Sequence, residues 1–159
     1  MNAVVVNGAI TAAGFALPRF VTSTHFQMRM NPGDAHPVSG GASLRSLASF
    51  RETGVHAVAA IGNPQRFFDM LRESGLRLYE HPMPDHYPFK PGDLNFGDAL
   101  PVLMTEKDAV KCAPFADARC WYVPVTAQFP EEQERALVDL VISRINAFNA
   151  GKRGGAPHG

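Results

Sequence analysis

Short, almost wholly apolar runs alternate along most of the chain with stretches in which apolar residues recur every three or four positions. The runs at 55–61 and 102–104 are typical of strands buried in a parallel sheet. Two further strands are predicted at residues 76–80 and 120–125. The periodic stretches are typical of amphipathic helices; they cover residues 43–54, 63–75, 105–113 and 131–148. This alternation predicts an α/β fold in three layers, with a parallel four-stranded sheet and helices on both of its faces.

The beginning of the chain follows a different pattern. A β-branched apolar run at residues 3–6 predicts a strand that starts almost at the first residue, so residues 1–24 are expected to belong to a larger domain. Residues 25–30 and 35–38 predict two strands joined by the Asn-Pro-Gly-Asp turn at 31–34. The predicted organisation after residue 24 is a β-hairpin linker at 25–41, a small α/β domain at 42–149 and a disordered tail at 150–159.

Composition narrows the class of protein. Of 159 residues, 45% are hydrophobic, and 15 Lys and Arg balance 15 Asp and Glu. A net charge of zero argues against nucleic acid as a partner, because phosphate binding favours a basic excess. Cys112 and Cys120 are too few for a disulfide framework and are expected to be reduced thiols. No apolar run is long enough to predict a membrane span, so this chain by itself is expected to be soluble.

Three polar segments each follow a predicted strand, and together they mark a candidate site. They are residues 62–64, 85–87 and 105–108. Because the carboxyl ends of parallel strands meet at one edge of a sheet, these segments are expected to lie at the same edge. Ligands of α/β proteins collect at that edge, so the sequence predicts a binding site there.

The segment at 105–108 combines helix capping with positive charge. Thr105 is a suitable N-cap, and Asp108 follows it at the position of a capping-box carboxylate. Lys107 and Lys111 are four residues apart on one face of the helix, beside an N-terminus that favours anions. The plainer alternative is a well-capped helix whose charges face solvent, and it is the more frequent arrangement. Asn63 likewise caps the preceding helix, which packing alone explains about as well as function does.

Asp85 and His86 predict acid–base chemistry. A carboxylate beside an imidazole, in a loop stiffened by three prolines, is suited to orienting the ring as an acid, a base or a relay partner. The alternative is a loop histidine without a function. Four of the other histidines, namely His25, His36, His56 and His81, are scattered, and none of these has metal-ligand spacing with a cysteine. No metal site is therefore predicted in this chain.

Several long motifs resemble one family. AVAAIGNPQRFFDMLRESG, PDHY, PVLMTEKDAVKC and WYVPV, followed by a long last helix, resemble the carboxyl-terminal half of the tetraacyldisaccharide 4'-kinase family. The FQMRM and NPGDA segments and the opening AVVVNG resemble the middle of the same family, so the resemblance covers residues 3–148. These motifs are long and ungapped, and they are therefore far more specific than a short glycine pattern.

The resemblance implies a bacterial lipid kinase at the cytoplasmic face of the inner membrane. Such a kinase transfers the γ-phosphate of ATP to the 4' hydroxyl of tetraacyldisaccharide 1-phosphate in lipid A biosynthesis. The family's ATP and Mg²⁺ are bound mainly by a phosphate-loop domain, of which residues 1–24 would be a remnant. The phosphate-loop pattern G-x-x-x-x-G-K-[ST] does not occur in these 159 residues. Because phosphoryl transfer depends on those parts, the chain is expected to be inactive without its amino-terminal kinase domain.

The resemblance also implies roles for individual residues. His86 matches a histidine that pairs across the cleft with the catalytic aspartate, and Asp85 would hold its ring. The other matching residues would contact phosphate or polar substrate groups (Thr105, Lys107 and Asp108) or shape the cleft edge (Asn63). Two alternatives remain open from the residues themselves. One is an autonomous, non-catalytic α/β module that binds a nucleotide or another small molecule, and the other is a structural interaction domain.

Overall fold

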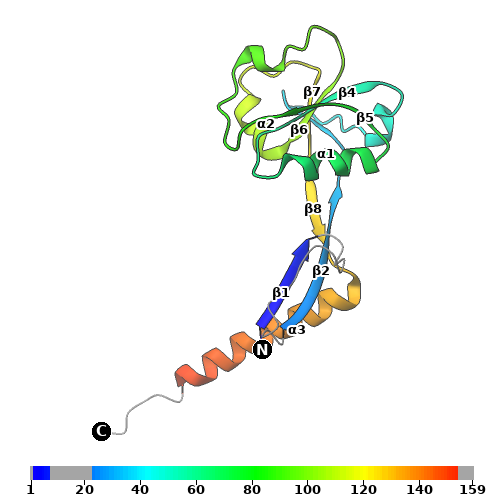
Figure 1. Ribbon diagram of the computed structural model, residues 1–159. Helices are drawn as coiled ribbons and strands as arrows, with labels where there is room; N and C mark the ends of the chain where they lie inside the picture. The colour runs from blue at the N-terminus through cyan, green and yellow to red at the C-terminus, as the bar shows by residue number, and fades with distance from the viewer. Residues whose placement is uncertain (1, 8–22, 154–159) are drawn as a thin grey trace. The chain divides into compact units, whose positions relative to one another are not determined.

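The computed structural model describes residues 2–7 and 23–153, which fall into two compact units (Figure 1). One unit comprises residues 31–126, and the other comprises residues 1–30 together with 127–159. The chain is therefore divided differently from the predicted ranges. The last helix belongs with the first 30 residues and not with the α/β domain, where the sequence placed it.

The unit at 31–126 contains a mixed, five-stranded sheet. Its strands, in spatial order, are β3 (His36–Pro37), β7 (Cys120–Val123), β6 (Val102–Thr105), β4 (Gly54–Ala59) and β5 (Arg77–Pro82). The four strands from β7 to β5 run parallel, but β3 pairs antiparallel with β7. The prediction of a purely parallel, four-stranded sheet is therefore wrong, because Val38 N–H donates to the carbonyl of Cys120 and adds an edge strand.

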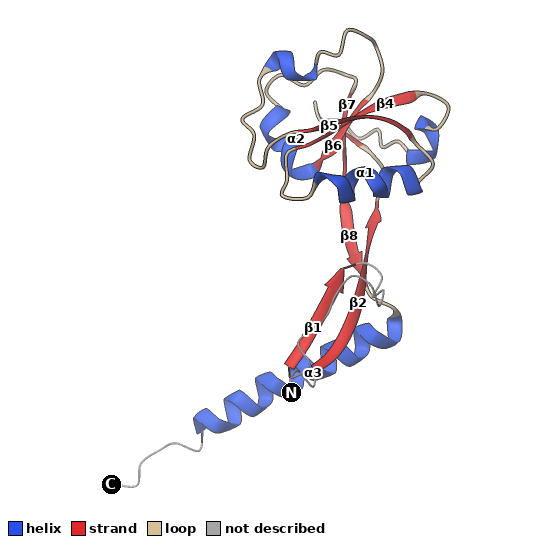
Figure 2. Cartoon of the chain, viewed as in Figure 1, coloured by secondary structure: helices blue, strands red, loops and turns tan. Residues whose placement is uncertain are grey.

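Helical segments cover both faces of this sheet (Figure 2). Helix α1 (Pro64–Glu73) and the 3-10 turn η1 (Leu47–Phe50) pack on one face, where residues 43–54 were expected to form a longer helix. Helix α2 (Glu106–Cys112) and the 3-10 turn η2 (Pro91–Leu94) pack on the other. Apolar side chains of β4 enter both cores, which explains why its sequence, apart from His56, is apolar without alternation.

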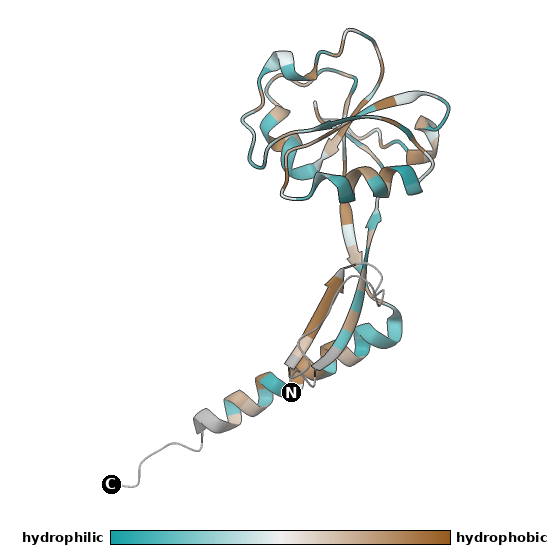
Figure 3. Cartoon of the chain, viewed as in Figure 1, coloured by the Kyte–Doolittle hydropathy of each residue, from teal (hydrophilic) through white to brown (hydrophobic). Residues whose placement is uncertain are grey.

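The predicted β-hairpin at 25–41 does not form. Strand β2 (Ser23–Pro32) belongs to a separate sheet of order β1-β2-β8, which also contains β1 (Asn2–Asn7) and β8 (Val125–Gln128). β1 runs parallel to β2 and is strongly hydrophobic in sequence (Figure 3). Pro124 lies between β7 and β8, and a residue without an N–H suits such an interruption between two ladders. β2 thus pairs with a distant strand and not with the segment that follows its turn.

Helix α3 (Glu131–Arg153) is longer than predicted and includes residues 150–153, which were expected to be tail. Leu137 and Leu140 are half-buried, and Gln133 accepts a hydrogen bond from the backbone N–H of Gln27 at 2.7 Å. Val141 and Ile145 are about half exposed, so the predicted apolar face is only partly covered. Within residues 2–7 and 23–153, no helix is long and apolar enough to cross a membrane.

Gly75 ends α1, as the sequence predicted. Its N–H donates to the carbonyl of Arg72, and the N–H of Leu76 donates to the carbonyl of Leu71, which is the Schellman pattern. The backbone at Gly75 has φ +87°, and an added Cβ would lie 3.0 Å from Nε of Arg51. Both features favour glycine at this position.

The substitution Gly75→Ala is expected to lower the free energy of unfolding by about 1–2 kcal/mol, because alanine is strained at positive φ. Urea denaturation of the chain measures the change. Gly92→Ala is the matched control, since no atom lies within 4 Å of the added Cβ and its φ is ordinary. Equal stability of the two variants would contradict the cap assignment.

Candidate functional site

The three predicted segments meet at the carboxyl end of β4. The side chain of Asp108 accepts a hydrogen bond from Ala60 N–H at 2.9 Å, and the carbonyl of Ala60 accepts one from His86 N–H at 3.4 Å. An added Cβ at Gly62 would lie 3.7 Å from a carboxylate oxygen of Asp85. The segments at 62–64, 85–87 and 105–108 are thus in contact around one strand end.

Asp108 is a buried structural link at this edge. Its carboxylate is 0% exposed, and it accepts from the Thr105 hydroxyl at 2.7 Å and from Nζ of Lys111 at 3.1 Å, in addition to Ala60. A buried carboxylate with three donors has no oxygen turned toward a ligand. This placement differs from the predicted contact between Asp108 and phosphate or substrate. It also gives Lys111 a partner that the sequence did not indicate.

Thr105 is the N-cap of α2, as predicted. Its hydroxyl oxygen accepts from the N–H of Asp108 at 3.2 Å while its proton is donated to the Asp108 carboxylate. The hydroxyl is therefore occupied in both directions. Lys107, by contrast, is exposed and makes no hydrogen bond or ion pair with any residue that the structure describes. Within the Thr105-to-Asp108 segment, Lys107 is the positive group best placed to meet a ligand from solvent.

His86 has an unusual backbone conformation. It is the third residue of a four-residue turn, closed by a hydrogen bond from Tyr87 N–H to the carbonyl of Pro84, and its φ is +60°. A non-glycine residue with positive φ is uncommon, and such strain tends to occur at functional sites. The carboxylate of Asp85 accepts from His86 N–H at 3.0 Å and stabilises the turn.

The imidazole of His86 reaches into solvent. Its side chain is 72% exposed, and Nε2 lies 3.7 Å from the nearest carboxylate oxygen of Asp85. That distance is too long for a hydrogen bond, so Asp85 fixes the backbone of the turn more firmly than the ring. The ring is therefore free to meet a partner outside the described part of the chain.

Asn63 caps α1, as predicted. Its side-chain oxygen accepts from the N–H of Arg66 at 3.4 Å, and Pro64 occupies the first helical position. Asn63 is exposed at the same strand edge. Its part in shaping a cleft stays a prediction.

A second polar cluster was missed in the sequence. His56 and His81 share a hydrogen bond of 2.9 Å between Nδ1 and Nε2, and Nε2 of His56 lies 3.1 Å from both carboxylate oxygens of Asp98. Phe96 stacks on both rings, at 4.1 and 4.0 Å between ring centres. Because an ionised carboxylate only accepts, His56 carries its proton on Nε2, and His81 donates to Nδ1 when His56 is neutral. We call these four residues the histidine cluster.

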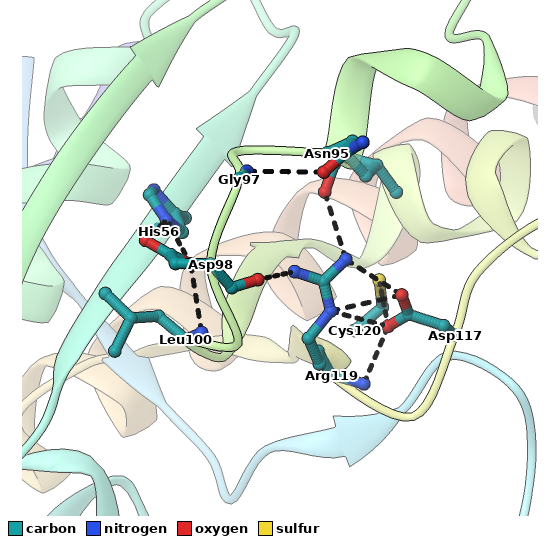
Figure 4. Close-up of polar contacts among 9 residues, drawn as sticks. His56, Asn95, Gly97, Asp98, Leu100, Asp117, Arg119 and Cys120 are labelled. Atoms are coloured by element: carbon teal, nitrogen blue, oxygen red, sulfur yellow. Dashed lines mark hydrogen bonds and ion pairs between the residues drawn. The ribbon is translucent and has the colours of Figure 1, made fainter.

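Two hydrogen bonds hold the loop that carries Asp98 in place (Figure 4). The guanidinium of Arg119 donates to the carbonyl of Asp98 at 2.8 Å, and the side chain of Asp98 accepts from Leu100 N–H at 3.0 Å. The Leu100 hydrogen bond, aided by the one from His56, lowers the pKa of the Asp98 carboxyl. Burial, aided by repulsion from His56, lowers the pKa of His81.

The histidine cluster predicts acid sensitivity. Because the pKa of His81 is lower in the folded chain than its usual 6.5, the unfolded chain binds more protons below that pH. The free energy of unfolding is therefore expected to fall as pH is lowered from about 7 to about 5. His81→Gln keeps a donor for His56 but does not titrate, so this variant should lose less stability over the same interval.

Denaturant titrations at each pH measure the effect. His86→Gln is the matched control, because it removes an exposed histidine outside the cluster. An identical pH dependence in the His81→Gln variant and the original chain would show that His81 does not carry the effect.

The two cysteines are poorly suited to act as nucleophiles. Cys112 and Cys120 are free thiols and are buried, and burial raises the pKa of Cys112 to about 12. At neutral pH Cys112 is therefore protonated and a poor nucleophile. Among residues 2–7 and 23–153, no three His, Cys, Asp or Glu side chains are grouped so that they could hold a metal ion.

Known proteins resemble this chain along most of its length. The family model described as tetraacyldisaccharide-1-P 4'-kinase matches residues 1–143. A tetraacyldisaccharide 4'-kinase of Nitrosococcus oceani is 51% identical over 116 residues, which are 73% of this chain and 34% of the relative. One of Methylobacillus flagellatus is 40% identical over 145 residues, which are 91% of this chain and 39% of the relative.

A solved structure shares the fold. The crystal structure of the "apo" form of LpxK from Aquifex aeolicus in complex with ATP matches with a TM-score of 0.57 at 19% identity, over 91% of this chain and 42% of that one. The chain thus spans well under half the length of these relatives. Because the family model matches residues 1–143, the chain belongs to the tetraacyldisaccharide 4'-kinase family.

Proposed function

We propose that this chain is the carboxyl-terminal part of a lipid kinase of lipid A biosynthesis. The whole protein transfers the γ-phosphate of ATP to the 4' hydroxyl of tetraacyldisaccharide 1-phosphate at the cytoplasmic face of the bacterial inner membrane. The observation that carries the proposal is the meeting of the His86 turn and the Thr105-to-Asp108 segment at the end of β4. Both segments carry motifs that resemble those of the family.

In this proposal His86 acts on the catalytic aspartate of the amino-terminal kinase domain. An exposed imidazole can donate a hydrogen bond to that carboxylate, orient it and tune its pKa. The aspartate then takes the proton of the 4' hydroxyl as the phosphoryl group transfers. Asp85 stabilises the turn that presents the ring, through its hydrogen bond to the His86 N–H.

Lys107 is proposed to contact a phosphate or a polar group of the substrate, because it is the unpaired, exposed cation of its segment within the described residues. Thr105 and Asp108 support it indirectly by capping and anchoring α2. Asn63 shapes the cleft edge. The ligands of Mg²⁺ and most contacts to ATP are assigned to the amino-terminal domain, because the phosphate-loop pattern does not occur in these 159 residues.

Titration of the isotope-labelled chain with ATP and Mg²⁺ tests the proposal. A carboxyl-terminal part of the kinase should show little saturable binding, because the phosphate loop is the main nucleotide contact. An autonomous nucleotide-binding module should instead show a tight, localised response at residues 62–64 and 105–108. That response would contradict the proposal.

Activity is measured in a chimera. In it, this chain replaces the matching 39% of the Methylobacillus flagellatus relative. The chimera supplies the amino-terminal kinase domain that the proposal requires as a partner. Its substrates are ATP and tetraacyldisaccharide 1-phosphate.

A further inference from the structure

Ala60 is held on both sides at the end of β4. Its N–H donates to Oδ2 of Asp108 at 2.9 Å, and its carbonyl accepts from the N–H of His86. The N–H and the carbonyl of one residue belong to two successive peptide planes. Fixing both planes therefore fixes the backbone dihedrals of Ala60.

The His86 turn has no regular secondary structure to hold it in place. Two hydrogen bonds join it to the strand, from Met83 N–H to the carbonyl of Ala59 at 2.9 Å and from His86 N–H to that of Ala60 at 3.4 Å. A residue at positive φ persists only where its surroundings determine the backbone. The His86 N–H is shared between the Asp85 carboxylate at 3.0 Å and the Ala60 carbonyl, so these two acceptors together determine the His86 conformation.

Asp108 holds the N–H of Ala60. Its carboxylate is fully buried, and the Thr105 hydroxyl and Lys111 ammonium hold it from α2. The hydrogen bond to Ala60 N–H joins residues 48 positions apart in the sequence. It connects the helix that carries Lys107 with the strand end that carries the His86 turn.

We propose that Asp108 is a positioning residue for His86 and acts on it through Ala60. This role rests on the proposed function, in which the His86 ring must meet a group of the amino-terminal domain. The carboxylate of Asp108 does not touch the substrate. Asp108 fixes the position of the strand end that holds the His86 turn. One buried carboxylate therefore positions both the His86 turn and the segment that carries Lys107.

The variant Asp108→Asn tests the connection in this chain by NMR spectroscopy. An amide keeps the size of the side chain but replaces one acceptor oxygen with a donor, so it cannot satisfy the same three donors. We expect displaced backbone resonances at Ala60 and His86 and loss of the positive-φ scalar coupling at His86. Resonances of β7, two strands away from β4, should stay in place.

Two further variants separate positioning from general loss of stability. Lys111→Met removes one partner of Asp108 but leaves the hydrogen bond to Ala60, so the His86 resonances should not move. Thr105→Val removes the hydroxyl that donates to Oδ2, which is the same oxygen that accepts from Ala60 N–H, whereas Lys111 binds Oδ1. It should therefore displace the His86 resonances, by less than Asp108→Asn does. If Asp108→Asn does not fold, Thr105→Val decides the question. The proposal would be overturned if whichever of Asp108→Asn and Thr105→Val folds leaves the His86 resonances where they are in the original chain.

The chimera tests the consequence for the reaction. Asp108→Asn should lower kcat by about tenfold to a hundredfold, with KM nearly unchanged, because a displaced group loses alignment and not substrate binding. An unchanged kcat in an active chimera with shifted His86 resonances would overturn the positioning role. An inactive unmodified chimera would instead refute the proposed function, and NMR would still decide whether Asp108 controls the His86 turn.

Discussion

Replacing His86 with alanine in the chimera is expected to lower kcat by about 10²–10⁴-fold, the usual range for a group that assists proton transfer. In the proposed mechanism the exposed ring is the part of the turn that meets the catalytic aspartate of the amino-terminal domain. Steady-state phosphate transfer from ATP to the lipid measures the effect. The free energy of unfolding should change by less than about 1 kcal/mol, because the side chain is solvent-exposed.

The variant His86→Asn supplies a control for the backbone. Asparagine tolerates positive φ better than alanine does, so it preserves the turn while removing the imidazole. Both variants should lose activity to a similar extent if the ring is what matters. Recovery of activity in His86→Asn, or a collapse of the melting temperature in His86→Ala, would make His86 a structural residue of the turn.

The substitution Asp108→Ala is expected to lower the free energy of unfolding by about 3 kcal/mol. Removing the carboxylate leaves the buried N–H of Ala60 without its acceptor, which costs about 1–3 kcal/mol. It also leaves the Thr105 hydroxyl and Lys111 without their partner, although Lys111 is 27% exposed and can turn toward water. Urea denaturation of the chain measures the loss.

Lys111→Met is the matched control for this effect. It breaks the ion pair from its more exposed side and leaves both other hydrogen bonds of Asp108 in place. Its cost is expected to be smaller than that of Asp108→Ala, because the buried carboxylate loses its counter-charge but keeps two hydrogen-bond donors. A loss from Asp108→Ala no larger than the loss from Lys111→Met would mean that the link to Ala60 contributes little.

Local features were predictable because their determinants are adjacent in sequence. Asn63 and Thr105 cap the helices that follow them, and Gly75 closes α1 through hydrogen bonds to residues a few positions away. The apolar run that became β4 was recognisable from composition alone. The parallel order of the main strands also brought the three polar segments to one edge, as the alternation of strand and helix indicated.

Long-range pairing was not predictable from one sequence. One of the two partners of β2 is β8, about a hundred residues later, and nothing in the Asn-Pro-Gly-Asp turn distinguishes that pairing from a local hairpin. The histidine cluster depends on strand register, which places His56 beside Tyr79 and His81 two residues further along. Neither the turn at 31–34 nor the positions of the histidines in the sequence indicate which residues of two strands lie opposite each other.

The role of Asp108 was not predictable either, because it depends on a contact with a residue that is distant in the sequence. In the sequence it is an acidic residue in the first turn of a helix, which favours exposure beside the positive end of the dipole. In the structure the end of β4 covers it, and its carboxylate binds a backbone N–H of that strand. Asp108 was predicted to contact phosphate or substrate, but in the structure it is buried and joins α2 to the end of β4.

Phosphate transfer by the chimera, compared with this chain alone, tests most directly the claim that the chain is one part of a two-part lipid kinase. Both proteins are incubated with ATP, Mg²⁺ and tetraacyldisaccharide 1-phosphate, and the position of the new phosphate is determined by mass spectrometry. The chimera is expected to phosphorylate the 4' hydroxyl, and the chain alone is expected to form no product. Turnover by the chain alone, or an inactive but folded chimera, would contradict the claim.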